Sequence, residues 1–154
     1  MLPNHFPSQK RRPIWVAGLQ VKGFYEYIPP AMDAATIRKP EPAAVLTKAV
    51  LAAAHRLGLR NRQLAEVLGA SEASVSRLRG RRLIDPVSKE GELALLFLRL
   101  YRSLDALVGG DDTKAEAWLR AENVHLRGVP AERIRTVEGL VDVVQYLDAM
   151  RGRL

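Results

Sequence analysis

The sequence predicts an all-α fold after residue 42, and three observations indicate it. Apolar residues recur at helical spacing along most segments of this part of the chain. The stretch 61–82 has the pattern of a helix-turn-helix. Before residue 43, prolines exclude a long helix; they stand at positions 3, 7, 13, 29, 30, 40 and 42. We therefore expect an irregular N-terminal arm (1–42), a helix-turn-helix domain (43–90) and a small helical C-terminal domain (91–154).

The helix-turn-helix is predicted from the places where small and apolar residues fall. Ala65 is small enough to let two helices touch, and Gly69 can adopt the positive φ that the turn requires. Ser71 is the expected N-cap of the second helix, which should end near Gly80. Apolar side chains should hold the two helices together; these are Leu64, Leu68, Val75 and Leu78.

Positive charge is concentrated in the part of the chain that holds this motif. Residues 1–90 carry 15 lysines and arginines and seven acidic residues, whereas residues 91–154 carry nine and ten. Six arginines lie in or beside the motif, against only Glu66 and Glu72. A short helical unit with this balance is expected to lie on a polyanion. The sequence therefore predicts binding to double-stranded DNA, with a protein-binding role left for the C-terminal half.

We expect the second helix of the motif to enter the major groove with its N-terminus first. The residues expected near base edges are Ser71, Glu72, Ala73, Ser76 and Arg77. Arg77 is the main candidate for reading a base, because a guanidinium matches guanine O6 and N7. The helix dipole is the simpler explanation of Glu72. Phosphate contacts are expected from Arg60, Arg62, Arg79, Arg81 and Arg82, with a solvated basic face as the alternative.

One such unit covers little DNA, so a two-fold homodimer on a palindrome is expected. A helix over about 88–108 bears on the dimer, because Leu95 and Leu98 lie opposite its main apolar face. A helix that is apolar on both sides is normally covered on both sides. We favour a dimer partner as the second cover; a small domain that wraps the helix is the alternative.

Four more helical segments complete the predicted fold. The first runs from about residue 42 to residue 57 and is capped by Gly58. Thr113 and Glu116 form a capping box for a helix to about residue 121, in which Trp118 should anchor the core. A short helix follows at 130–135. Thr136 should cap a final helix to about residue 150, whose inward residues are expected to be Val137, Leu140, Val141, Val144, Leu147 and Met150.

Composition and motifs argue against an enzyme and against a membrane protein. There is no cysteine, which excludes disulfides and thiolate sites and fits a cytoplasmic protein. No apolar run approaches the ~18–20 residues that span a bilayer. His5, His55 and His125 have no metal-ligand spacing, and no GxSxG, P-loop or GxGxxG motif occurs. We expect no catalytic residue, metal site, cofactor or small-molecule substrate. In the arm, the segment 14–28 has aromatic and β-branched residues that suit a strand, but the simpler expectation is a mobile arm that orders partly against the body of the protein or against a partner.

The C-terminal part resembles the toxin-binding domain of the MbcA/ParS/Xre antitoxin family. The similar features, in order, are Ala117-Trp118-Leu119, Asn123 with Leu126, Gly128-x-Pro130, and Thr136-x-Glu138-Gly139 before the last helix. With the helix-turn-helix upstream, the resemblance covers roughly residues 43–154. It implies an all-α chain in which a DNA-binding helix-turn-helix domain precedes a small helical toxin-binding domain.

The resemblance also implies a partner, a RES-domain toxin that consumes NAD, and repression of the antitoxin's own operon, which the toxin modulates. Some antitoxins of the family place their C-terminal end in the active-site cleft of the toxin. On that ground the expected toxin-binding residues are Tyr146, Met150, Arg151, Gly152, Arg153 and Leu154. Without the resemblance, a solvated C-terminus would be the simpler reading. A stand-alone dimeric transcriptional regulator remains the alternative function, since it would share every DNA-binding feature.

Overall fold

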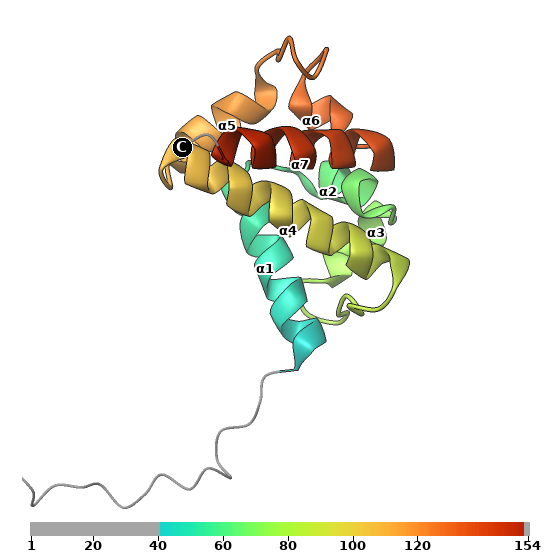
Figure 1. Cartoon of the computed structure of the whole chain (residues 1–154). Coiled ribbons are helices and arrows are strands. Elements are labelled where there is room, and N and C mark those ends of the chain that lie inside the picture. The colour runs from blue at the N-terminus through green and yellow to red at the C-terminus, as the bar shows by residue number, and fades with distance from the viewer. Residues whose placement is uncertain (1–40, 153–154) are drawn as a thin grey trace, which may run out of the picture. The chain divides into compact units, whose positions relative to one another are not determined.

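The computed structural model describes residues 41–152, and the expectations for the arm up to residue 40, including a strand at 14–28, lie outside them. Within the described range the chain forms helices and no strand, which confirms the all-α prediction (Figure 1). The helices are α1 (Pro42–Arg56), α2 (Asn61–Leu68), α3 (Glu72–Arg77), α4 (Lys89–Val108), α5 (Asp112–Arg120), α6 (Pro130–Arg133) and α7 (Val137–Arg151).

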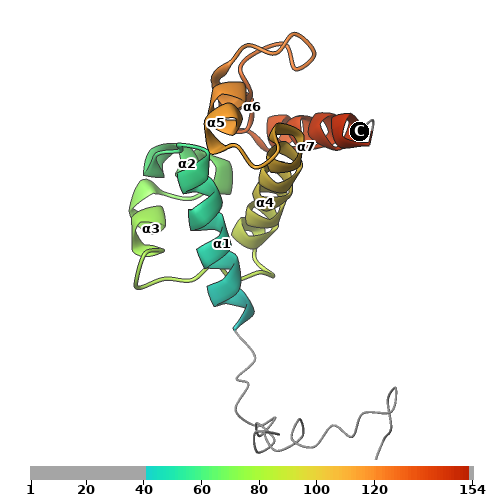
Figure 2. The same cartoon turned by 90° about the vertical axis from the view of Figure 1, so that its left-hand side faces the viewer.

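Helix α4 is the centre of the packing. It contacts α1, α2, α5 and, most extensively, α7. Figure 2 shows α1, α2 and α3 on one side of α4 and α7 on the other. Phe97, Leu100 and Leu104 of α4 are completely buried and belong to one apolar cluster that includes residues of all these helices. Burial of this continuous cluster holds the helix-turn-helix and the C-terminal helices in one body.

The helix-turn-helix forms as predicted from α2 to the start of α3. Gly69 adopts a φ of +63°, and Ala65 and the four expected apolar side chains are buried. Ser71 caps α3, since its Oγ accepts a hydrogen bond from the Ser74 amide at 3.2 Å. The predicted end near Gly80 is wrong, because α3 stops at Arg77. The amides of Gly80, Arg81 and Arg82 all donate hydrogen bonds to the Arg77 carbonyl. The chain therefore turns there instead of continuing the helix.

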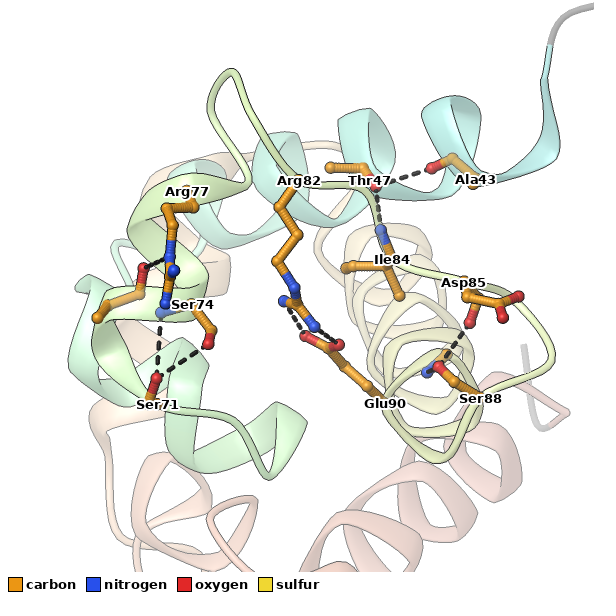
Figure 3. Close-up of polar contacts among 12 residues, drawn as sticks. Ala43, Thr47, Ser71, Ser74, Arg77, Arg82, Ile84, Asp85, Ser88 and Glu90 are labelled. Carbon is orange, nitrogen blue, oxygen red and sulfur yellow. Dashed lines mark hydrogen bonds and ion pairs between the residues drawn. The ribbon is translucent and has the colours of Figure 1, made fainter.

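The segment after α3 is fastened to both α1 and α4 (Figure 3). The Ile84 amide donates to Thr47 Oγ1 of α1 at 2.8 Å, and that hydroxyl donates to the Ala43 carbonyl at 2.7 Å. Arg82 binds the Glu90 carboxylate with both terminal guanidinium nitrogens. These contacts fix the position of α3 relative to the centre of the fold.

The start of α5 and the place of its tryptophan differ from the predictions. Asp111, not Thr113, is the N-cap, because its Oδ1 accepts from the Lys114 amide at 3.1 Å. The helix therefore begins earlier than the expected capping box would allow. Ala115 and Leu119 are its buried residues. Trp118 lies at the edge of that stripe, only partly buried, so it does not anchor the core.

Helix α7 begins as predicted but its buried stripe is displaced at both ends. Thr136 Oγ1 accepts from the Gly139 amide at 3.1 Å, which confirms the N-cap. The buried apolar residues are Leu140, Val143, Val144 and Leu147. Val137 is 61% exposed and Met150 is 36% exposed, so the prediction that both point inward is wrong. Val137 is the first residue of α7 and projects beyond the contact with α4, and Met150 lies near its free end.

On α4, the side opposite the main apolar face is not covered by the described part of the chain. Leu95 is 51% exposed, whereas Leu98 is partly buried. Val45 of α1 is also 51% exposed. An open groove of about 930 Å³ lies between α1 and α4. Its lining combines apolar residues with arginines, namely Ala49, Ala52, Leu95 and Leu98 with Arg56, Arg99, Arg102 and Arg151. The domain within residues 41–152 thus does not wrap this side of α4 at Leu95.

Candidate functional site

Helix α3 presents an exposed face made of the residues expected near DNA bases. Ser71, Glu72, Ala73, Ser76 and Arg77 are all exposed, while Val75 between them is completely buried. Burial of Val75 fixes which side of α3 faces outward. Figure 3 shows α3 with its N-cap serine and its last residue, which carry the polar contacts of this helix.

The polar side chains of α3 are partly engaged with the helix itself. The Ser71 hydroxyl both caps the helix and donates to Ser74 Oγ at 2.9 Å. Arg77 Nε donates to the Ala73 carbonyl at 3.1 Å, which holds the guanidinium along the helix. Its two terminal nitrogens make no hydrogen bond within residues 41–152. These nitrogens are the atoms that a bidentate contact with a guanine would use.

The arginines around the helix-turn-helix fall into two groups. Arg60, Arg62, Arg79 and Arg81 are exposed, with only long or single contacts such as Arg79 Nη2 to Asn61 Oδ1 at 3.3 Å. Arg82 is different, because its side chain is only 35% exposed and is bound to Glu90. The hydrogen bond to Glu90 raises the pKa of Arg82 above its ordinary value. The four exposed arginines are thus available to phosphate groups of DNA, whereas Arg82 fixes the position of the segment that follows α3.

Three aromatic rings from separate segments stack beside α7, a contact that sequence reasoning missed. Tyr146 of α7 stacks on Trp118 of α5, with ring centroids 6.3 Å apart, and on His125, with centroids 5.9 Å apart. Of these, only Tyr146 was expected in a binding surface. Helical periodicity describes each helix separately, so it carries no signal for a contact between a helix and the 123–128 loop.

A pocket of about 440 Å³ opens between this loop and α7. We call it the loop pocket; it is lined by His125, Leu126, Arg127, Arg133, Asp142, Gln145 and Tyr146. Asn123 shapes the loop, since its Oδ1 accepts from the His125 and Leu126 amides at 3.0 and 3.2 Å. An isolated bridge between Asn123 and Gly128 closes the loop. The pocket therefore has one wall that is tied down by its own hydrogen bonds.

The last turns of α7 are fixed to α4 by one carboxylate. Asp148 accepts hydrogen bonds from Ser103 Oγ at 2.6 Å and from Arg99 Nε at 2.8 Å. Arg151 Nη2 lies 3.8 Å from the same carboxylate. The Ser103 hydrogen bond and the Arg99 charge lower the pKa of Asp148. The C-terminal end of α7 therefore points in a defined direction.

Two family models match the chain, and together they span most of the described structure. Residues 37–99 match the antitoxin Xre-like helix-turn-helix domain. Residues 103–153 match the antitoxin Xre/MbcA/ParS C-terminal toxin-binding domain. The chain belongs to the Xre-type antitoxins. This confirms the family resemblance of residues 117–154. No curated protein matches the chain significantly.

Two of the exposed surfaces described above lie in different matched domains of the antitoxin. The exposed face of α3 lies within the helix-turn-helix match, and the loop pocket lies within the toxin-binding match. Of the residues expected to bind a toxin, Tyr146 is partly buried and Met150, Arg151 and Gly152 are exposed. Arg153 and Leu154 lie outside the described residues.

No group of three or more histidine and acidic residues in 41–152 could hold a metal ion. No helix in the same range is long and apolar enough to cross a membrane.

Proposed function

We propose that this antitoxin neutralises a RES-domain toxin that consumes NAD, and that as a homodimer it represses its own operon. The toxin-binding domain and the helix-turn-helix give the two partner classes, a toxin and DNA. The resemblance of residues 117–154 to RES–Xre antitoxins supports the RES-domain partner. One observation carries the neutralising role: α7 is fixed to α4 through Asp148 and ends in an exposed Arg151.

In this proposal residues 151–154, at the C-terminal end of α7 and beyond it, block the active-site cleft of the toxin. The anchored helix gives the terminal residues a fixed starting point, so little ordering entropy is lost when they bind. Arg151 and Arg153 carry guanidinium groups, which suit a cleft built for a pyrophosphate or lined by acidic groups. The inhibition is then steric, and it needs no catalytic residue in the antitoxin.

A truncated antitoxin lacking residues 151–154 tests this mechanism. We expect it to fold and to bind the RES-domain protein encoded beside it, but to leave NAD consumption by that protein largely uninhibited. NAD is measured in a mixture of the two purified proteins, and binding is measured by calorimetry. Full inhibition by the truncated antitoxin would exclude blockage by the terminal residues.

The DNA-binding role rests on the exposed face of α3 and on the four exposed arginines. In this proposal α3 lies in the major groove and Arg77 contacts a guanine. Arg60, Arg62, Arg79 and Arg81 contact phosphates, which fix the position of the antitoxin without reading the sequence. Arg82 acts mainly through Glu90, by holding the segment after α3; its own phosphate contact stays a prediction. Gel-shift titration of the antitoxin with its own promoter fragment measures this binding.

A stand-alone dimeric regulator is the second candidate function, because it would share the exposed face of α3 and the exposed arginines. Co-expression of the antitoxin with the product of the neighbouring gene, followed by affinity purification, distinguishes the two. Co-purification of a RES-domain protein supports the antitoxin role. Promoter binding without any such partner supports the regulator.

A further inference from the structure

The loop pocket carries more positive than negative charge. Arg127 is exposed and makes no ion pair within residues 41–152. Arg133 Nη2 lies 2.6 Å from Asp142 Oδ2, but Arg133 Nε is buried and has no hydrogen-bond partner among the described residues. The Arg133 side chain is nevertheless 38% exposed and contributes to the lining of the pocket. Two guanidinium groups and one carboxylate thus favour an acidic group in the pocket.

The aromatic stack beside the pocket has the composition of a protein-binding hot spot. Trp118 and Tyr146 are partly buried, so each keeps surface that another molecule can cover. Tryptophan, tyrosine and arginine are the residues that most often dominate binding energy at interfaces. Trp118 is not needed to fill the core of α5, because Ala115 and Leu119 do so. The stack therefore supplies an apolar surface next to the basic pocket.

One exposed face of α7 runs from the loop pocket toward the end of that helix. Asp142, Tyr146 and Met150 follow each other at intervals of four residues, which places them along one face. The distance along the axis from Asp142 to Met150 is about 12 Å. A single partner can therefore contact the pocket, the stack and Met150 at once, whereas Arg151 lines the groove beside α4.

We infer that the toxin places an acidic side chain in the loop pocket, between Arg127 and Arg133, and an apolar side chain against the Trp118–Tyr146 stack. This inference rests on the proposed function and deepens it by separating two tasks. The pocket and the stack supply most of the affinity, and the residues after α7 supply the inhibition. Because Asn123 ties the loop down before binding, little ordering is required when the toxin docks.

Binding of purified toxin to four antitoxin variants, measured by calorimetry, tests the inference. Tyr146→Ala and Arg127→Glu should each weaken binding by about tenfold or more. Arg127→Lys keeps the charge but loses the planar guanidinium, so it should weaken binding less than Arg127→Glu does. Lys48→Glu reverses an exposed charge on α1 and is the matched control, with no expected effect. The truncated antitoxin without residues 151–154 should keep most of its affinity.

The outcomes separate the inference from the proposed function. Wild-type binding together with unchanged affinity of Tyr146→Ala and Arg127→Glu overturns the inference and leaves the proposed function standing. Absence of wild-type binding overturns both. Loss of promoter binding by these two variants, with toxin binding intact, also overturns the inference. If Tyr146→Ala does not fold, Arg127→Glu decides, because the Arg127 side chain is exposed.

A charge-swap experiment tests the acidic occupant itself. Exposed aspartates and glutamates of the toxin are changed one at a time to arginine and titrated with Arg127→Glu. One of these toxin variants should bind the Arg127→Glu antitoxin at least about tenfold more tightly than the wild-type toxin does. Recovery by none of them would exclude an acidic side chain as the group that enters the pocket.

Discussion

Arg135 and Glu66 form a two-point ion pair. Arg135 lies in residues 133–136, which we call the elbow before α7, and Glu66 lies in helix α2 of the helix-turn-helix. Arg135 Nε lies 2.7 Å from Glu66 Oε2, and Arg135 Nη2 donates to Glu66 Oε1 at 3.1 Å. Arg135 also binds Glu132. The toxin-binding domain is therefore joined to the DNA-binding motif by a directional contact as well as by the shared core. Movement of α7 against a toxin would be transmitted to α2 through this pair.

We predict that Arg135→Ala weakens the effect of the toxin on operator binding. The variant should fold and bind DNA alone with nearly wild-type affinity, because exposed ion pairs contribute little to stability. The change in operator affinity on adding toxin should be smaller than for the wild type, as measured by gel shift with and without the toxin. Lys114→Ala, which removes the local pair with Asp111, is the control. Equal toxin effects in wild type and Arg135→Ala would show that the pair transmits nothing.

Arg77 and Arg79 should have different effects on DNA binding. Arg77→Ala should reduce discrimination at one base pair of the operator by about 1–3 kcal/mol, because its guanidinium matches guanine O6 and N7 with two hydrogen bonds. Arg79→Ala should lower affinity for all sequences similarly and flatten the salt dependence by about one unit of slope. Competition with single-base operator variants at several salt concentrations measures both. Identical profiles for the two variants would contradict this placement of α3.

Local patterns predicted the helix-turn-helix well, because each of its features depends on residues near in sequence. Gly69 needs a positive φ, and Ser71 reaches an amide three residues on, as the sequence predicted. The end of α3 was not predictable in this way, since three amides compete for the Arg77 carbonyl. Two adjacent sets of capping residues made the start of α5 ambiguous, and Asp111 took the position.

The binding surface of the C-terminal domain was only partly predictable, for a different reason. Tyr146 was expected there from the family resemblance, but its stacking on Trp118 and His125 joins three segments. Such a contact depends on how α5, the loop and α7 pack, which no local period records. The tryptophan was expected in the core because large aromatic residues usually are buried, yet the smaller Ala115 and Leu119 fill that position.

The stability of the antitoxin should fall in acid partly because of Asp148. Its pKa is lowered below the ordinary value of 3.8, first by the Ser103 hydrogen bond and then by Arg99. A carboxyl group with a lowered folded-state pKa stabilises the fold above its unfolded pKa, and this contribution is lost as pH falls through the folded value. Asp148→Asn should therefore be less stable near neutral pH, with a shallower loss below pH 4. Urea unfolding across this pH range measures the difference, and Glu138→Gln at an exposed position is the control.

Gly139→Ala should destabilise the antitoxin by about 1–3 kcal/mol. A Cβ at this position would lie 2.0 Å from the Arg133 carbonyl oxygen, so the elbow and α7 would have to separate. The same substitution at Gly80, where nothing lies within 4 Å, should be neutral or slightly stabilising. Urea unfolding of both variants makes the comparison. A stable Gly139→Ala protein would mean that the elbow adjusts without cost.

The exposed groove between α1 and α4 leads to a prediction about the homodimer. Leu95 and Val45 are each 51% exposed, and a charged side chain at the centre of such a surface cannot be buried against a second copy without a large desolvation cost. Leu95→Arg should therefore shift the antitoxin toward the monomer in sedimentation experiments and weaken operator binding, while circular dichroism stays unchanged. Leu83→Arg, at an exposed position in the segment before α4, is the matched control and should leave the association state as it is. Because two half-sites must be held together for specific binding, operator affinity and dimer fraction should fall together in Leu95→Arg. A dimer that persists in this variant would place the interface on another surface of the antitoxin.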